Sequence, residues 1–176
     1  MPSLRSVVGL LLSLIFLAAC QPSNQNINEE GKDKLEIHEV VNEPVQTDFR
    51  DTIYVPIYSS IYSQTKDESF LLTATLSIRN TSMSDSMYIQ AIDYYNTKGD
   101  LVRKYTENTL FLKPLESIDY VIDEADESGG TGANFIIIWS AKDDRLKPVF
   151  EAIMISTRGQ QGISFTASGI SISRNR

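Results

Sequence analysis

The sequence contains one cysteine and one histidine, and its only long apolar run lies near the N-terminus. Because Cys20 has no second cysteine to pair with, no disulfide can form within the chain, and a folded domain must be stabilised by its own core. A catalytic triad needs a positioned imidazole, and a zinc site needs several histidine or cysteine ligands. His38 alone supplies neither, so cysteine- or histidine-based catalysis and a metal site of this kind are disfavoured, and no cofactor is expected.

Positive charge is also scarce. The formal net charge is −7 at pH 7, and removal of residues 1–19, whose one charged residue is Arg5, would lower it by one, to −8. Nucleic acids bind proteins through clustered lysine and arginine residues. We therefore expect no nucleic acid among the partners of this chain.

Residues 1–19 have the three parts of a bacterial export signal. Arg5 supplies a positive start, residues 7–16 are almost wholly apolar, and Leu17-Ala18-Ala19-Cys20 follows them. The apolar run is too short for a membrane-spanning helix, which takes about 20 residues. The ending resembles the lipobox of bacterial lipoproteins, in which the cysteine is acylated and the preceding peptide is removed. The alternative is an ordinary secretory signal followed by an incidental cysteine.

Lipidation of Cys20 would attach the chain to a membrane. One fatty chain binds membranes only marginally, whereas a diacylglyceryl group with an N-acyl chain anchors a protein durably. Gln21 follows the cysteine, where an aspartate would resemble the inner-membrane retention signal of enteric bacteria. We expect a lipid-anchored protein of the cell envelope, on the outer membrane facing the periplasm if the host is Gram-negative.

The rest of the chain divides into a tether, residues 20–48, and one domain, residues 49–176. Gln21 to Lys34 is polar and rich in asparagine and glutamate, which is typical of a flexible tether. Leu35 to Val45 fits either a strand at the fringe of the domain or a continuation of the tether. The remaining length and a hydrophobic content of 41% suffice for one domain with its own core.

Alternating apolar and polar residues predict β-strands throughout this domain. In the clearest strand, Leu76 lies on the core face and Thr75 on the opposite face. Pro56 cannot donate a backbone hydrogen bond, which predicts that residues 53–57 form an edge strand. The continuous apolar run Phe135–Trp139 predicts a central strand, covered on both faces or with a hydrophobic outer surface. Further strands are expected at residues 87–95 and 101–105, joined as a hairpin, at residues 118–122, and at residues 150–157 and 163–167, joined as a second hairpin.

No stretch predicts a helix of any length behind the signal segment. Short strands separated by turn residues at this spacing predict an all-β fold, an antiparallel β-sandwich of immunoglobulin-like type. The absent cysteine pair excludes a true antibody-type domain.

Four ordered segments resemble a bacterial family catalogued as domain of unknown function 3124, whose members often follow a lipobox. The segments are Tyr54-Val55-Pro56-Ile57-Tyr58-Ser59, Leu72 to Thr81 (LTATLSIRNT), Ser128 to Phe135 (SGGTGANF) and Gly159 to Phe165 (GQQGISF). The resemblance covers residues 52–169. It implies a lipoprotein with a single domain, and it supplies no activity, substrate or catalytic residue.

The densest group of carboxylates lies between Asp123 and Gly132. Asp123, Asp126 and Glu127 could bind Ca²⁺ together with backbone carbonyls, because Ca²⁺ takes six to eight oxygen ligands. Their spacing does not match an EF-hand loop, and a solvated acidic loop explains them better. The glycines are followed by a strand and not by Gly-Lys-Ser/Thr, so they are not a phosphate-binding loop and instead permit positive φ in a tight connection.

A second polar loop, Arg158 to Gly162, offers a guanidinium group and two amides. If the strands at 135 and 153 are antiparallel neighbours, this loop and the acidic loop lie at the same end of the domain. Arg158 would then pair with Asp126 or Glu127, or the two loops would present a site to a partner, because binding residues are often carried by loops on a rigid scaffold. We predict a partner site whose members are Asp126, Arg158, Gln160 and Gln161.

Two classes of function remain open at this point. The first is a non-catalytic binding or scaffolding module that contacts another envelope protein or a glycan. The second is a carboxylate-dependent envelope enzyme, for example a glycan-acting one, for which a cleft with two converging acids would be the sign. The lack of histidine and cysteine favours the first class, and no catalytic residue is assigned.

Overall fold

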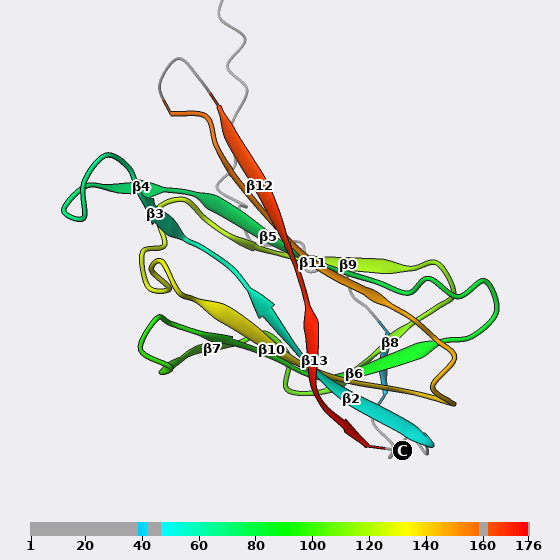
Figure 1. The fold of residues 1–176 in the computed structure, drawn as a ribbon. Coiled ribbons are helices and arrows are strands. Elements are labelled where there is room, and N and C mark those ends of the chain that lie inside the picture. Colours follow the sequence, from blue (N-terminus) through cyan, green and yellow to red (C-terminus); the bar gives the residue numbers. More distant parts are fainter. Residues whose placement is uncertain (1–38, 42–46, 159–161, 176) are drawn as a thin grey trace, which may run out of the picture. The chain divides into compact units, whose positions relative to one another are not determined.

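The computed structural model of this chain describes residues 39–41, 47–158 and 162–175 (Figure 1). The signal segment, Cys20 and most of the predicted tether lie outside the described residues. Within the described part, no helix is long and apolar enough to cross a membrane. The strands are β1 (Glu39–Val41), β2 (Phe49–Pro56), β3 (Ser60–Tyr62), β4 (Ser69–Leu71), β5 (Thr73–Arg79), β6 (Met87–Tyr95), β7 (Leu101–Lys104), β8 (Thr109–Leu112), β9 (Ser117–Ile122), β10 (Asn134–Ala141), β11 (Val149–Ser156), β12 (Ile163–Ser168) and β13 (Ile170–Asn175).

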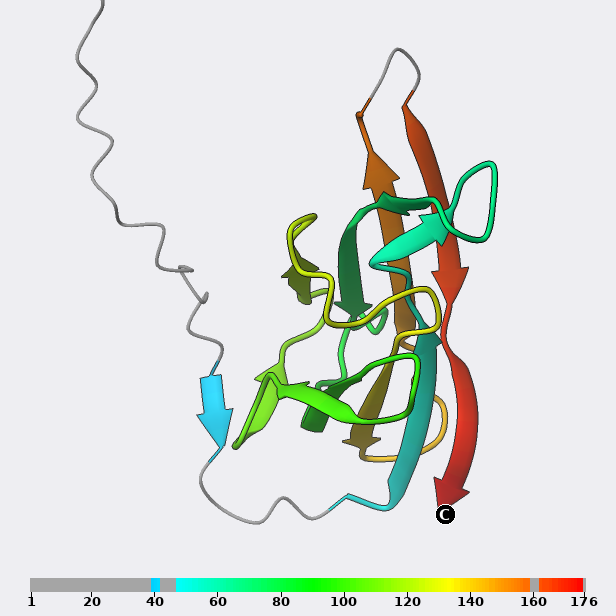
Figure 2. The same cartoon turned by 90° about the vertical axis from the view of Figure 1, so that its left-hand side faces the viewer.

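Two antiparallel sheets form the two layers of the domain (Figures 1 and 2). The larger sheet has the order β1-β8-β6-β10-β2-β13, with β7 paired to β6. The smaller sheet has the order β12-β11-β5-β9, and β3 and β4 form a separate two-stranded ribbon. The predicted all-β antiparallel sandwich is confirmed, as are both predicted hairpins, β6–β7 and β11–β12.

The core lies between the two layers and confirms the predicted register of β5. Leu76 is fully buried, whereas Thr75 is half-buried on the outer face. β10 lies between β6 and β2 in the larger sheet, as a central strand should. Its inward residues Phe135, Ile137 and Trp139 are buried, and the outward apolar residues Ile136 and Ile138 are half-buried, so the continuous apolar run reflects a partly covered outer face.

The immunoglobulin-like character resides in the central strand pairs. An immunoglobulin sandwich pairs its second strand with its fifth in one sheet and its third with its sixth in the other. Here β5 pairs with β9 and β6 pairs with β10, in opposite sheets. Relative to an immunoglobulin domain, the flanking strands are exchanged between the two sheets, because β2 pairs with β10 and β11 pairs with β5.

The predicted edge position of the strand around Pro56 is wrong. β2 lies between β10 and β13 and forms backbone pairs on both sides. Pro56 is the last residue of β2, and β13 begins at Ile170, opposite Tyr54. Since β13 does not reach Pro56, the missing N–H leaves no partner unsatisfied there, and the strand tolerates proline without being an edge.

Several short strands were not expected. β8 and the β3–β4 ribbon have no clear alternation, and β1 lies inside the predicted tether, where it pairs with β8. The fringe strand considered for Leu35–Val45 is therefore present over Glu39–Val41. β13 was missed although Ile170 and Ile172 alternate with serines in the sequence; both isoleucines are exposed in the structure.

A single glycine lets the chain pass from the smaller sheet to the larger one. Gly169 separates β12 from β13, and its N–H donates to the Phe150 carbonyl oxygen at 2.8 Å. A Cβ at this position would lie 2.6 Å from Ile53 Cγ2 and 3.0 Å from Phe150 Cβ. Only glycine fits this crossing without displacing the core, and the crossing brings β13 alongside β2.

Candidate functional site

The two predicted loops do lie at one end of the sandwich, although for a different reason from the one expected. β10 and β11 belong to different sheets, so the premise that they are antiparallel neighbours is wrong. Instead, β9 and β11 both run antiparallel to β5 on its two sides, so Ile122 and Ile155 both end beside the start of β5 at Ala74 and Thr73. The loops that follow β9 and β11 therefore leave the smaller sheet at the same end, hereafter the loop end.

Asp126 is held by contacts that brace the loop end. Its Oδ1 accepts hydrogen bonds from the Ser128 backbone N–H and hydroxyl, and its Oδ2 lies 2.9 Å from Arg103 Nη2. Arg103 also donates to the Tyr105 hydroxyl at 2.8 Å. Burial alone would raise the pKa of Asp126, but the Ser128 and Arg103 contacts outweigh it, and the pKa lies below its ordinary value. The carboxylate is therefore stabilised in its charged form.

Arg158 forms a different ion pair. Its Nε lies 2.8 Å from Glu124 Oε1, so it pairs with neither Asp126 nor Glu127. Gln160 and Gln161 lie outside the described residues. Asp126 and Arg158 are thus at the same end but in separate ion pairs, and the predicted partner site stays a prediction. No three histidine, cysteine, aspartate or glutamate side chains cluster as metal ligands within the described ranges.

The glycines of the acidic loop have the role expected of them. Gly130 has a φ of +78°, a backbone conformation that residues with a Cβ rarely adopt. Its N–H donates to the Ser59 hydroxyl at 2.8 Å and its carbonyl oxygen accepts from the Ser59 N–H at 3.1 Å. The loop is in this way attached to the start of the β3–β4 ribbon.

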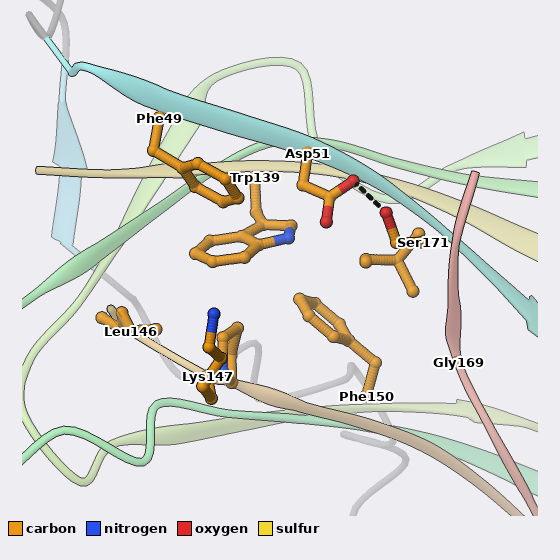
Figure 3. A pocket seen from close by; sticks show the side chains of 10 residues that line it. Phe49, Asp51, Trp139, Leu146, Lys147, Phe150, Gly169 and Ser171 are labelled. Carbon is orange, nitrogen blue, oxygen red and sulfur yellow. Dashed lines mark hydrogen bonds between the residues drawn. The ribbon is translucent and has the colours of Figure 1, made fainter. Parts of the chain in front are cut away.

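The opposite end of the sandwich contains a cavity that the sequence did not predict (Figure 3). Its volume is about 200 Å³. Its walls come from β2, β10, β11, β13 and the segment between β10 and β11. The lining residues are Phe49, Asp51, Ile53, Trp139, Leu146, Lys147, Pro148, Phe150, Gly169 and Ser171. We call this the pocket end. The polar groups in its lining belong to Asp51, Trp139, Lys147 and Ser171.

Asp51 is the buried acid of the cavity. It is 2% exposed because β2 places it on the inner face, two residues before Ile53. Its Oδ1 accepts from the Thr52 backbone N–H at 2.8 Å and from the Ser171 hydroxyl at 2.7 Å. The bond to Ser171 depends on β13, which pairs with β2 only because the chain has crossed at Gly169. The crossing thus completes this wall of the cavity.

Trp139 is the only tryptophan of the chain and lies directly opposite Asp51 in the β10–β2 pair. Its ring packs on Phe49, with centroids 5.3 Å apart, and on Phe150, with centroids 6.0 Å apart. The side chain is 3% exposed, yet Nε1 has no hydrogen-bond acceptor among the described residues. Figure 3 shows this nitrogen on the side of the indole that faces Asp51 and Ser171. A buried donor without a partner is costly, and native structures rarely leave one.

A bulge in the neighbouring strand accompanies the placement of Trp139. The register between β10 and β6 shifts between Ile138, opposite Ala91, and Trp139, opposite Ile89. The extra residue, Gln90, is half-buried on the outer face. Bulges of this kind often lie beside functional sites, where they change the direction of a side chain.

The segment between β10 and β11 covers the cavity. Leu146 is 8% exposed, and Lys147 lies beside it in the lining of the cavity (Figure 3). The Thr81 hydroxyl donates to the Lys147 carbonyl oxygen at 2.8 Å, and Lys147 Nζ donates to the Asp144 carbonyl oxygen at 2.6 Å. These contacts fix the cover on the rest of the pocket end.

A buried asparagine organises the loops behind this cover. Asn80 is 2% exposed, and its Nδ2 donates to the Asp85 carbonyl oxygen at 2.8 Å and to the Lys113 carbonyl oxygen at 2.9 Å. Its Oδ1 accepts from the Ser82 N–H at 3.0 Å. One side chain thereby joins the segments after β5 and β8 at the pocket end.

The family model described as "Protein of unknown function (DUF3124)" matches residues 50–172 of the 176 residues. The chain belongs to the DUF3124 family. The match includes Asp51, Trp139, Lys147 and Ser171, the residues with polar side-chain groups in the cavity, whereas Cys20 precedes it. The resemblance proposed from four segments is thereby confirmed.

Other comparisons add little to the DUF3124 assignment. No curated protein matches the chain in sequence. A structure of Thermotoga maritima 1070 is similar over 68% of this chain and 92% of that one, with 12% identity and a TM-score of 0.40. At that score the likeness supports no argument about the fold or function of this chain.

Two features of the sequence indicated the cavity. Asp51 is in phase with Ile53, Val55 and Ile57, so the alternation of this strand already placed an acid on the core face. Trp139 ends an apolar run on the inward phase set by Phe135 and Ile137. Ser171 gave no signal, because its place depends on the sheet crossing.

Proposed function

We propose that this DUF3124 protein is a lipid-anchored, non-catalytic binding module of the bacterial cell envelope, and that it binds a small ligand in the cavity at the pocket end. The observation that carries the proposal is the Trp139 N–H group, which is buried, faces the cavity and has no acceptor among the described residues. Small-molecule sites are concave, mostly apolar, and contain a few convergent polar groups. The cavity has these properties, with Asp51 and Ser171 beside the indole.

The carboxylate-dependent enzyme is the alternative. Glycoside hydrolases of the usual type place two carboxyl groups on either side of the bond that is cleaved. Of the described residues that line the cavity, Asp51 alone carries a carboxyl group. Its Oδ1 already accepts two hydrogen bonds. This supports binding over hydrolysis at the pocket end.

The anchor is proposed from the sequence alone. Residues 17–20 match a lipobox, and two or three fatty chains on Cys20 would hold the domain on a membrane without help from its acidic surface. Replacement of Cys20 by alanine is expected to abolish labelling by palmitate and to leave the protein unprocessed or released. Palmitate labelling that persists in Cys20→Ala would rule out this anchor.

The binding proposal is tested by the molecules that copurify with the protein. The lipidated chain is extracted from producing cells, and small molecules are identified by mass spectrometry after denaturation. Ser171→Phe, which fills the cavity, should remove a molecule that accompanies the wild type. Ser168→Phe is the matched control, because Ser168 is exposed opposite Glu151 of β11 and does not line the cavity. Identical molecules in all three preparations would contradict the proposal.

A further inference from the structure

The polar groups of the cavity offer a donor and acceptors side by side. Trp139 Nε1–H is a donor without a protein acceptor. The Ser171 hydroxyl donates to Asp51 Oδ1 at 2.7 Å, so the oxygen of Ser171 keeps lone pairs that can accept a hydrogen bond. A ligand that satisfies this side of the cavity must therefore both accept and donate. Hydroxyl groups do both from a single atom.

The remaining walls are apolar and mostly aromatic. The rings of Phe49 and Phe150 pack against Trp139 (Figure 3). Ile53, Leu146 and Pro148 add aliphatic surface to the lining. Such walls can contact the C–H groups of a ligand. The cavity therefore suits a ligand with polar groups along one edge and C–H groups over its face.

Size limits the ligand to about one ring. A cavity of about 150 Å³ in a protein core holds benzene. The cavity here measures about 200 Å³, which leaves room for a six-membered ring with substituents. It is too small for a drug-sized molecule, whose pockets start at about 300 Å³.

Charge selects against ions of either sign. A buried carboxyl group and a net charge of −7 disfavour an anionic ligand. Aromatic rings can also surround an ammonium ion. Asp51 would attract such an ion, but an ammonium group offers no acceptor to the Trp139 N–H and is repelled by the Lys147 side chain. A neutral ligand with an acceptor oxygen satisfies the buried donor and therefore suits the cavity better.

Resting on the proposed binding function, we infer that the cavity binds the six-membered ring of a neutral sugar. One ring hydroxyl accepts from Trp139 Nε1–H, a neighbouring hydroxyl donates to the Ser171 oxygen, and the C–H face of the ring lies against the aromatic walls. A single ring fills the cavity, so the site recognises a free monosaccharide or the terminal unit of a glycan.

Because the chain has one tryptophan, ligand binding in the cavity can be followed by the signal of that residue. The indole N–H gives one resonance in an NMR spectrum of the ¹⁵N-labelled chain, and that resonance reports on the cavity alone. The lipidated chain, in a detergent without a sugar headgroup, is titrated with glucose, galactose and N-acetylglucosamine. At least one of them should shift the resonance in a saturable way. Tetrahydropyran, which has the ring without the hydroxyls, should not.

Variants separate the inferred contacts from general damage to the fold. Ser171→Ala should lower the affinity for the sugar by about tenfold, the value of one hydrogen bond to the ligand. Replacing the indole by its benzothiophene analogue during biosynthesis removes the N–H at nearly constant shape and should lower affinity similarly, measured by calorimetry. Tyr88→Phe, on the outer face of β6, is the matched control and should leave affinity unchanged.

Three outcomes would overturn the inference. If choline or benzamide saturates the indole shift and no sugar does, the cavity is a binding site for another class of ligand, and the proposed function survives. If no compound shifts the resonance and no molecule is lost on Ser171→Phe, the proposed function fails as well. Sugar binding that is indifferent to both cavity variants would place the sugar elsewhere.

Discussion

The two ends of the sandwich use acidic side chains in opposite ways. At the loop end, Asp126 and Glu124 are partly exposed and each forms an ion pair with an arginine from another part of the chain. At the pocket end, Asp51 is 2% exposed and bonds to a backbone N–H and to a serine hydroxyl on the wall of a cavity. A high density of polar residues in the sequence indicates the loop end, where ion pairs hold the loops in place. A single acid in a core-facing register indicates the end that contains the cavity.

The largest expected effect concerns the core between the ends. Leu76→Ala should lower the free energy of unfolding by about 2–5 kcal/mol, because it leaves a cavity beside fully buried neighbours. Thr75→Ala, one residue away on the outer face, should cost far less. Chemical denaturation measures both, and a reversed order would contradict the burial of these two positions.

The next effect distinguishes the ends by their glycines. Gly169→Ala should lower the free energy of unfolding by about 1–3 kcal/mol, because the new Cβ would lie 2.6 Å from Ile53 Cγ2 in a packed core. Gly162→Ala is the control near the loop end, where the nearest atom to an added Cβ is the Ser156 carbonyl oxygen at 3.6 Å. It should be neutral or slightly stabilising. Equal losses at both positions would refute a tight crossing at Gly169.

Strand alternation was sufficient to predict the layers but not their connections. The register of β5 and both hairpins follow from local patterns, since a strand with one buried face alternates with period two. The partners of β2 do not follow, because proline at a strand end looks the same as proline at a sheet edge. The crossing at Gly169 depends on contacts with Ile53 and Phe150, which are distant in sequence.

The same distinction explains what was predicted of the candidate site. Loop residues such as Asp126 and Arg158 stand out in a sequence because they cluster, yet the structure shows each bound to an ion-pair partner. Asp51, Trp139 and Ser171 are separated by long stretches of chain and meet only after β2, β10 and β13 have paired. The inward phases of Asp51 and Trp139 were the two local signs of the cavity.

A smaller effect appears only in alkaline solution and concerns the loop end. Tyr94 is fully buried beside Gly129, and burial raises its pKa from 10.0 to about 12. The raised value means that the neutral phenol stabilises the fold fully below pH 10.0, and that this contribution is lost as pH rises toward 12. Tyr94→Phe should weaken the fall in stability between these values, measured by thermal unfolding across pH. Tyr62→Phe, at an exposed position, controls for the loss of a hydroxyl, and an equal change there would contradict the assignment.

The smallest expected effect on stability tests whether the loop end does more than brace the fold. Arg158→Ala combined with Gln161→Ala removes the ion pair with Glu124, and pairs this exposed contribute at most about 1 kcal/mol. If the predicted partner site exists at this end, crosslinking in intact envelopes should recover fewer partners from the double variant at unchanged thermal stability. Ser171→Phe, at the pocket end, should leave those partners in place, because its cavity lies at the opposite end of the sandwich. Partners retained by the double variant, with stability reduced, would mean that the ion pairs only hold the loops, and the binding function would then rest on the cavity beside Trp139 alone.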